Sequence, residues 1–186
     1  VTLTATDSVK FMDIDTGGRL VINSSKTMNC GGNIIMYGTG NFTNNGTLNV
    51  VGELLMSSAT SPIVNNNVNV TGWFTLPVGT AYTQSSGTLT VGGDIEISGA
   101  MSMGSGASMV LNRSGGFISG TGTYTTASGG SFPITNNKTI VPGTTITIGT
   151  PSVNTTLSIA TGTIVNNIGA ITVNGNVTGA NGSTSI

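Results

Sequence analysis

Apolar residues return to equivalent positions about every twenty residues between Thr27 and Ser119. A fixed period of this length indicates a supersecondary unit whose apolar face is buried by stacking on its neighbours. Apolar and polar residues also alternate within each unit, which predicts strands with one buried face. The aligned columns are Met28, Leu48, Val68, Leu89 and Met109; Cys30, Val50, Val70, Val91 and Leu111; and Ile34, Leu54, Phe74 and Ile95.

A glycine separates the second column from the third, at Gly32, Gly52, Gly72 and Gly93. Glycine accepts a change of chain direction that would strain a residue with a Cβ atom, so these positions predict corners. Strand, corner and strand within about twenty residues is typical of a coil in a parallel β-solenoid. We predict an all-β chain folded as a parallel β-solenoid, a β-helix expected to be right-handed, with about 20 residues and three short strands per coil. Roughly nine such coils would fit the 186 residues.

The remaining strand of each coil is predicted from another apolar position, about six residues before the first column. Ile22, Phe42 and Ile63 are its expected members. Asparagine-rich corners follow these residues; asparagine tolerates tight turns, and stacked asparagines can hydrogen-bond from coil to coil. We therefore predict turn ladders rather than a binding site at these corners. They are Asn44-Asn45-Gly46, Asn65-Asn66-Asn67, Asn136-Asn137 and Asn166-Asn167.

The pattern predicts a single solenoid domain over residues 1–186. Residues 1–17 are expected to form an N-terminal strand or cap, because β-branched and apolar residues dominate its first six positions. Residues 101–130 are rich in Gly and Ser and lose the register, which predicts either an irregular coil or a loop. The opening motif returns from Ala170 to Val177, so the solenoid is expected to continue to the end.

Charge is scarce, with five Lys and Arg, six Asp and Glu, and no His. The basic residues are too few and too scattered for a phosphate-binding surface, so nucleic acid is not an expected partner. No apolar run approaches the ~20 residues that span a bilayer, so membrane insertion is not expected. The chain starts at Val1 rather than at methionine, which fits an exported precursor with its signal removed, or an excised fragment. The basic residues are Lys10, Arg19, Lys26, Arg113 and Lys138.

Without histidine, the commonest general base and metal ligand is missing, and paired carboxylates are the remaining candidates for chemistry. Asp94 and Glu96 lie two apart on a predicted strand and are expected to point outward, with Glu53 and Trp73 in the column of Asp94. A tryptophan ring offers an apolar platform for a sugar. The alternative function is thus a carbohydrate-binding or polysaccharide-degrading β-helix. Basic residues that would bind an acidic sugar are not expected near these acids, and no enzyme activity is predicted.

Three further patterns favour structural roles over chemical ones. The segment from Asp13 to Gly18 has the carboxylate spacing that begins a calcium loop but lacks the later acidic ligands, so we predict a turn and no metal or cofactor. Cys30 falls in a core column and is predicted to be a small buried residue. Regular threonines can bind ice, a third candidate function, but the outward positions here vary. Those positions are Asn29, Asn49, Asn69, Thr90 and Val110.

Asn-x-Ser/Thr patterns are frequent and mark glycosylation acceptors if the chain is exported. About six would arise by chance in a chain so rich in Asn, Ser and Thr, so the excess is slight. They begin at Asn23, Asn41, Asn45, Asn69, Asn112, Asn137, Asn154, Asn176 and Asn181.

The units Gly46-Thr47-Leu48-Asn49-Val50, Gly87-Thr88-Leu89-Thr90-Val91 and Gly169-Ala170-Ile171-Thr172-Val173 resemble the degenerate repeats of exported microbial β-solenoids. Filamentous-haemagglutinin-like adhesins and autotransporter passengers are the families that share this pattern. The resemblance covers most of the chain and implies a structural or adhesive role at the cell surface or outside the cell. It carries over no functional residue.

We therefore expect an extracellular structural protein, a subunit of a filament, fibre or adhesin stalk. Solenoid ends present unpaired strand edges, and such edges aggregate unless they are capped or used. Head-to-tail stacking would use them, as would donation of the first strand to another copy, so the expected partner is the chain itself, with glycans as a further candidate. The assembly residues are Val1, Thr2, Leu3, Thr4, Ala5 and Thr6.

Overall fold

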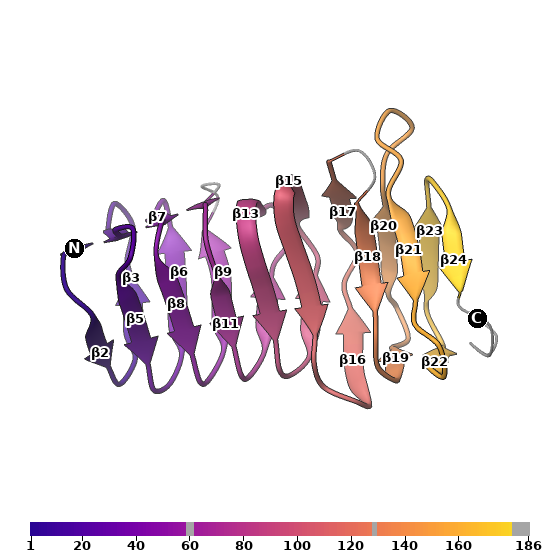
Figure 1. Ribbon diagram of the computed structural model, residues 1–186, viewed down its shortest axis with the longest axis horizontal. Coiled ribbons are helices and arrows are strands. Elements are labelled where there is room, and N and C mark those ends of the chain that lie inside the picture. The colour runs from indigo at the N-terminus through magenta and orange to yellow at the C-terminus, as the bar shows by residue number, and fades with distance from the viewer. Residues whose placement is uncertain (59–61, 128–129, 180–186) are drawn as a thin grey trace.

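The computed structural model describes residues 1–58, 62–127 and 130–179, and the regular secondary structure of these residues consists of β-strands. The strands pair in parallel and stack along one axis into a β-solenoid (Figure 1). It has about 8 turns of about 21 residues. The predicted parallel β-solenoid is confirmed. The number of coils is nearer eight than the predicted nine, because coils towards the C-terminus are longer.

Each coil contributes strands to three faces, as predicted. The first face contains β1 (Thr2–Leu3), β4 (Arg19–Ile22), β7 (Asn41–Asn44), β10 (Ile63–Val64), β17 (Thr123–Thr126), β20 (Thr145–Ile148) and β23 (Ala170–Val173). The second contains β2 (Asp7–Val9), β5 (Thr27–Cys30), β8 (Thr47–Val50), β11 (Val68–Val70), β18 (Ser131–Ile134), β21 (Thr156–Ile159) and β24 (Val177–Gly179). The third contains β3 (Met12–Ile14), β6 (Ile34–Gly38), β9 (Leu54–Ser58), β12 (Phe74–Leu76), β14 (Ile95–Ile97), β16 (Gly116–Ser119), β19 (Lys138–Ile140) and β22 (Val165–Asn167).

Two long strands, β13 (Ala81–Val91) and β15 (Ala100–Leu111), run through both the first and the second face. Their pairing shifts between Gln84 and Ser86, where β15 carries one extra residue. A β-bulge of this kind bends a strand, and here the bend takes the chain round a corner without interrupting the ladder. Residues 101–130, predicted as either an irregular coil or a loop, therefore contribute β15, β16 and β17 to the solenoid.

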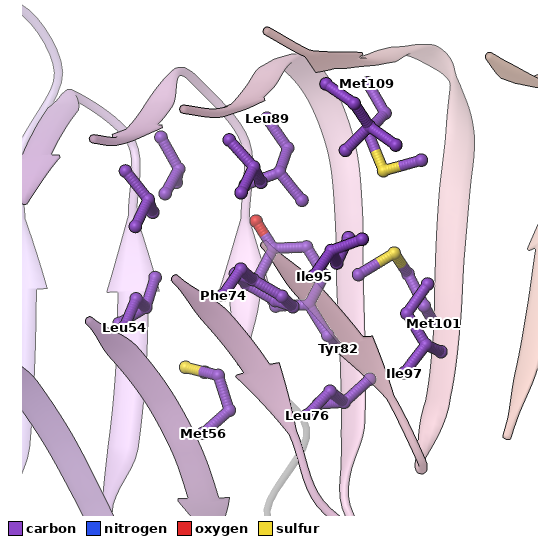
Figure 2. Close-up of a cluster of buried hydrophobic side chains, with 14 of the residues drawn as sticks. Leu54, Met56, Phe74, Leu76, Tyr82, Leu89, Ile95, Ile97, Met101 and Met109 are labelled. Carbon is purple, nitrogen blue, oxygen red and sulfur yellow. The ribbon is translucent and has the colours of Figure 1, made fainter. Parts of the chain in front are cut away.

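The predicted apolar columns are present and point into the core. Met28 pairs with Leu48, Leu48 with Val68, and the ladder continues in the same register. All members of the three columns are buried, Cys30 included, as predicted. Leu54, Phe74 and Ile95 follow one another along the third face, facing Leu89 and Met109 across the core (Figure 2).

The predicted column of Ile22, Phe42 and Ile63 is wrong. Phe42 pairs with Leu20, while Ile22 pairs with Asn44, because a turn at 23–26 adds two residues to the first corner. Ile63 is offset by one position from the inward-facing Val64 and is 52% exposed. Side chains alternate between faces along a strand, so a displacement of one residue turns Ile63 outward.

The glycine corners are confirmed, but their cause is packing between coils. The amide of Gly52 donates to the carbonyl oxygen of Gly32 at 3.0 Å, and that of Gly93 to Gly72 at 2.9 Å. A Cβ atom added to Gly72 would lie 2.7 Å from the carbonyl carbon of Gly52. None of these four residues has a positive φ. Glycine is required here because successive backbones approach too closely for any side chain.

Candidate functional site

The candidate carbohydrate-binding side chains predicted from the sequence lie close together on the outside of the third face. Phe74 pairs with Leu54 on one side and with Ile95 on the other. The residues that precede Leu54, Phe74 and Ile95 therefore lie in one column on successive coils. They are Glu53, Trp73 and Asp94. Backbone bonds fix this register, because the amide of Leu54 donates to the Trp73 carbonyl at 2.9 Å and that of Phe74 to the Asp94 carbonyl at 3.1 Å. The predicted alignment is therefore present.

The same column continues to Phe117, which was not predicted from the sequence. Ile95 pairs with Ile118, so Phe117 lies one coil beyond Asp94. Trp73 is 56% exposed and Phe117 47% exposed, and the two rings come from coils on either side of the Asp94 coil. A groove of about 220 Å³ lies on this face. Its lining consists of Trp73, Phe74, Thr75, Asp94, Ile95, Glu96, Phe117, Ser119 and Val141.

Hydrogen bonds hold the two carboxylates of the groove in place. Oδ1 of Asp94 accepts from the backbone amide of Phe117 at 2.9 Å and from the guanidinium of Arg113 at 3.2 Å. Oε1 of Glu96 accepts from the Ser98 hydroxyl at 2.8 Å. The hydrogen bond from the Phe117 amide to Asp94 connects the Phe117 backbone to the neighbouring coil. The Asp94–Arg113 pair adds little stability because the Arg113 side chain is 47% exposed.

One expectation about this face is corrected. A basic residue does lie beside the acids, since Arg113 forms an ion pair with Asp94. Glu53 belongs to the column but is not among the residues that line the groove, and its Oε1 accepts from the Thr75 hydroxyl at 2.6 Å. The groove therefore contains Trp73, Asp94 and Glu96 of the predicted set, with Phe117 in place of Glu53.

A buried lysine supports the segment that carries Arg113. Lys138 points into the core from β19, and its Nζ donates to the carbonyl oxygens of Leu111 and Arg113. Burial lowers the pKa of Lys138, the nearby Asp94 carboxylate opposes this, and the Arg113 charge adds to it. The register explains the inward position, since Lys138 lies beside Gly116, which has no side chain to fill the core. Lys138 thereby helps to place Arg113 next to Asp94.

The other residues considered for chemistry in the sequence, in the Asp13 to Gly18 segment and at Cys30, lie in a strand, a turn and the core. The predicted turn near the N-terminus is present, with the Gly18 amide donating to the Asp15 carbonyl at 2.8 Å. Asp13 lies on β3 and faces outward. Within residues 1–58, 62–127 and 130–179, no three His, Cys, Asp or Glu side chains are grouped to hold a metal ion. The Cys30 thiol is buried, with the Asn33 carbonyl oxygen 3.4 Å from its Sγ.

Asparagine ladders are present at a predicted corner and also on the outside of the second face. At the corner, Asn65 donates to Asn45 at 2.8 Å. On the second face, Asn49 donates to Asn29 at 2.8 Å and Asn69 to Asn49 at 2.9 Å. Three of the outward positions considered for ice binding thus form a ladder, which was not predicted although all three are asparagine.

The predicted glycosylation acceptors differ in accessibility. Asn181 lies outside the described residues. Asn69 uses its Nδ2, the atom a glycan would modify, in the ladder with Asn49. Half-buried acceptors are Asn23, Asn45 and Asn69, and exposed ones are Asn41, Asn112, Asn137, Asn154 and Asn176.

The N-terminal segment pairs with its own chain. In β1, Thr2 lies beside Val21 and Leu3 beside Ile22. The terminal amine of Val1 donates to the Arg19 carbonyl at 2.6 Å, and the Val21 amide donates to Val1 at 2.9 Å. The next residues are exposed and connect β1 to β2. They are Thr4, Ala5 and Thr6.

Fold and groove together define a parallel β-solenoid with an aromatic and acidic groove on one outer face. No protein-family model, curated protein or solved structure matches the chain. The described part of the chain contains no helix that is long and apolar enough to cross a membrane.

Proposed function

We propose that the chain is a structural unit of an extracellular filament, fibre or adhesin stalk, extended by end-to-end stacking of solenoids. The observation that carries this proposal is the pairing of the terminal strands. In the described residues, β1, β2 and β3 at one end and β22, β23 and β24 at the other are each paired on one side only. An open strand edge is a template for another strand.

The two ends match in direction and face. β1 and β23 are the terminal strands of the first face, and β2 and β24 those of the second, in which β18, β21 and β24 form a separate sheet. A second copy stacked in the same orientation continues both faces as parallel ladders, in a heterologous contact that repeats without closing. Stacking leaves the β1–β4 pairing intact, whereas donation of β1 to another copy would first break it. Stacking is therefore the favoured mode of assembly.

Apolar groups at the C-terminal end support the same proposal. Ile164, Ile168 and Val177 are 57%, 56% and 51% exposed. A small apolar pocket of about 110 Å³ lies between the last coils and is bordered by Leu157 and Val173 among others. Another coil placed on this end would remove these groups from water, which contributes about 25 cal/mol per Å² of apolar surface.

The test measures the polymers formed by the purified chain. Sedimentation velocity and negative-stain electron microscopy should show rods that lengthen with concentration. Val177→Lys places a charge on the edge strand β24 and should shorten the rods, while Val51→Lys, at a corner of the third coil and 57% exposed, should leave them unchanged.

Deleting residues 1–6 separates the two modes of assembly. Stacking survives the deletion, because β2 and β3 keep their open edges at this end. Strand donation predicts that the rods disappear. Monodisperse monomers at every concentration, for the unmodified and the shortened chain alike, would overturn the proposal.

A further inference from the structure

The groove on the third face has a composition that a purely structural surface does not need. Trp73 and Phe117 are large apolar side chains left about half exposed, at 56% and 47%. Single exposed apolar residues are common, but these two flank one groove that also holds two carboxylates. Small-molecule binding sites commonly combine aromatic side chains with a few polar groups held in fixed positions.

The spacing of the rings follows from the solenoid itself. Trp73, Asp94 and Phe117 occupy one column on three successive coils, so the ring-bearing backbones lie about 10 Å apart along the axis, at ~4.8 Å per coil. That separation is close to the length of a disaccharide unit in an extended chain. The groove, at about 220 Å³, is smaller than the ~300–1,000 Å³ of pockets that enclose drug-sized ligands. It suits a linear ligand that runs along the axis and passes beyond the groove at both ends.

The polar groups select for hydroxyls. Among the described residues, Oδ1 of Asp94 and Oε1 of Glu96 accept the hydrogen bonds given above, which leaves Oδ2 and Oε2 to accept from a ligand. Carboxylate oxygens only accept, so their natural ligands are O–H or N–H donors such as sugar hydroxyls. The hydroxyl of Ser119 and the half-exposed guanidinium of Arg113 add donors at the border.

The local charge argues against an acidic ligand. Asp94 and Glu96 face the groove, Glu53 lies in the same column, and Arg113 is the one half-exposed cation paired to them in the described structure. An anionic polysaccharide would meet net negative charge here, whereas a neutral one meets none of that repulsion.

We propose that the groove between Trp73 and Phe117 binds a neutral polysaccharide, which lies along the solenoid axis with its apolar sugar faces on the two rings and its hydroxyls on Asp94 and Glu96. This site goes beyond the structural role and does not depend on it, because the groove lies within a single chain, between its ends.

The chain carries its own reporter, since Trp73 is its only tryptophan. The probes are cellohexaose, laminarihexaose and chitohexaose, with hexagalacturonate as the acidic counterpart. At least one neutral hexasaccharide should change Trp73 fluorescence in a saturable manner, and hexagalacturonate should bind more weakly. No change with any of the three at about 10 mM, or tighter binding of hexagalacturonate, would overturn the proposal.

Variants then locate the site by isothermal titration with the best neutral probe. Trp73→Ala and Phe117→Ala should each weaken binding roughly tenfold or more, the effect expected for a central aromatic contact. Glu96→Gln keeps the shape and should weaken binding by a smaller factor. Phe11→Ala is the matched control, because Phe11 lies on the first coil of the same column and is 66% exposed.

The pattern of losses decides the outcome. Equal losses from Phe11→Ala and Trp73→Ala would mean non-specific contact with exposed rings and would overturn the assignment. Far-ultraviolet circular dichroism verifies that each variant is folded. If Trp73→Ala fails to fold, Phe117→Ala and Glu96→Gln still test the groove, and binding unaffected by both contradicts it.

Discussion

The coils before β16 and those after it differ in length, although both contribute to one continuous apolar core. In the first part, paired residues lie 19 to 22 positions apart, with a step of 20 between Met28 and Leu48. In the second part the step grows, and Ile140 pairs with Asn167, 27 positions further on. The extra residues leave the solenoid at corners, and the loop between β20 and β21 projects from the end of the first face (Figure 1). A constant period is therefore not required to keep a continuous core.

Coil length does decide which polar contacts can form. Constant coils bring identical side chains side by side, so asparagines stack in ladders such as that of Asn29, Asn49 and Asn69. Unequal coils place different residues together, so their buried polar groups pair singly, as the buried Asn44 and Gln84 also do in the first part. In the second part the Thr126 amide donates to the Thr155 hydroxyl at 3.1 Å, and the Lys138 amine donates to backbone carbonyls.

Among the described residues, each part also contains an edge-to-face aromatic pair, and removing either gives the largest expected effect. The ring centroids of Phe74 and Tyr82 are 5.2 Å apart, and those of Tyr124 and Phe132 are 4.9 Å apart. Phe74→Ala and Phe132→Ala should each lower the free energy of unfolding by about 3–5 kcal/mol, because both side chains are fully buried.

The two substitutions should differ in which part of the solenoid they destabilise. Stacked repeats are stabilised by their own and neighbouring units, so loss of Phe132 should unfold the second part first. In a urea titration, Phe132→Ala should shift the circular dichroism transition more than the Trp73 fluorescence transition. Phe74→Ala, next to Trp73, should shift both. Coincident shifts for both variants would show that the two parts unfold as one unit.

Alkaline pH tests the buried tyrosines of the two parts. Burial raises the pKa of both Tyr82 and Tyr124 above the ordinary value of 10.0. Above pH 10 the unfolded chain loses these protons and the folded chain keeps them, so stability is complete below that pH and falls as pH rises. The two residues together should cost up to about 2.7 kcal/mol per pH unit.

Lys138 acts in the opposite sense over a lower range. Burial lowers its pKa from 10.5, so folding becomes more favourable as pH rises towards 10.5 and gains nothing further above it. Urea titrations between about pH 10.5 and pH 11.5 therefore isolate the tyrosines. Tyr124→Phe should halve the slope in that interval. An unchanged slope in this variant would contradict the assignment.

The glycine corners of the first part give an intermediate effect. Gly72→Ala should cost about 1–3 kcal/mol, because the new Cβ atom would press against the Gly52 backbone and separate two coils. Gly79→Asn is the control. Gly79 has a φ of 78°, which asparagine tolerates, and a Cβ atom added there would have no neighbour within 4 Å. Thermal unfolding should show a clear loss for the first variant and a small one for the second.

The same contrast explains what the sequence could and could not reveal. The core columns from Met28 and Cys30 were predictable because equal coils repeat the apolar positions. The Ile22, Phe42 and Ile63 column was wrong for two separate reasons. Two extra residues in the first corner place Ile22 beside Asn44 rather than Phe42. Ile63 lies one position before the inward-facing Val64, and alternation of side chains turns this one-residue offset into a change of face.

The groove was partly predictable for the same reason. Trp73, Asp94 and Glu96 lie where the repeat is regular, so their shared face followed from the alignment. Phe117 lies beyond Arg113, where the spacing between partners grows to 23 residues, since Ile95 pairs with Ile118. Its signal was the apolar pair Phe117-Ile118 itself, which repeats the pattern of Trp73-Phe74 at a longer spacing.

The asparagine ladder of the constant coils gives the smallest expected effect. Asn49 donates to Asn29 and accepts from Asn69, so Asn49→Ala removes two hydrogen bonds from a partly exposed ladder. At about 0.5–1.5 kcal/mol for a hydrogen bond, and less where water can replace it, the loss should be about 1 kcal/mol in a urea titration. Asn154→Ala, in the exposed loop of the longer coils, should change stability by less than about 0.5 kcal/mol. Equal effects at the two positions would mean that the ladder follows from the equal coil length without helping to maintain it.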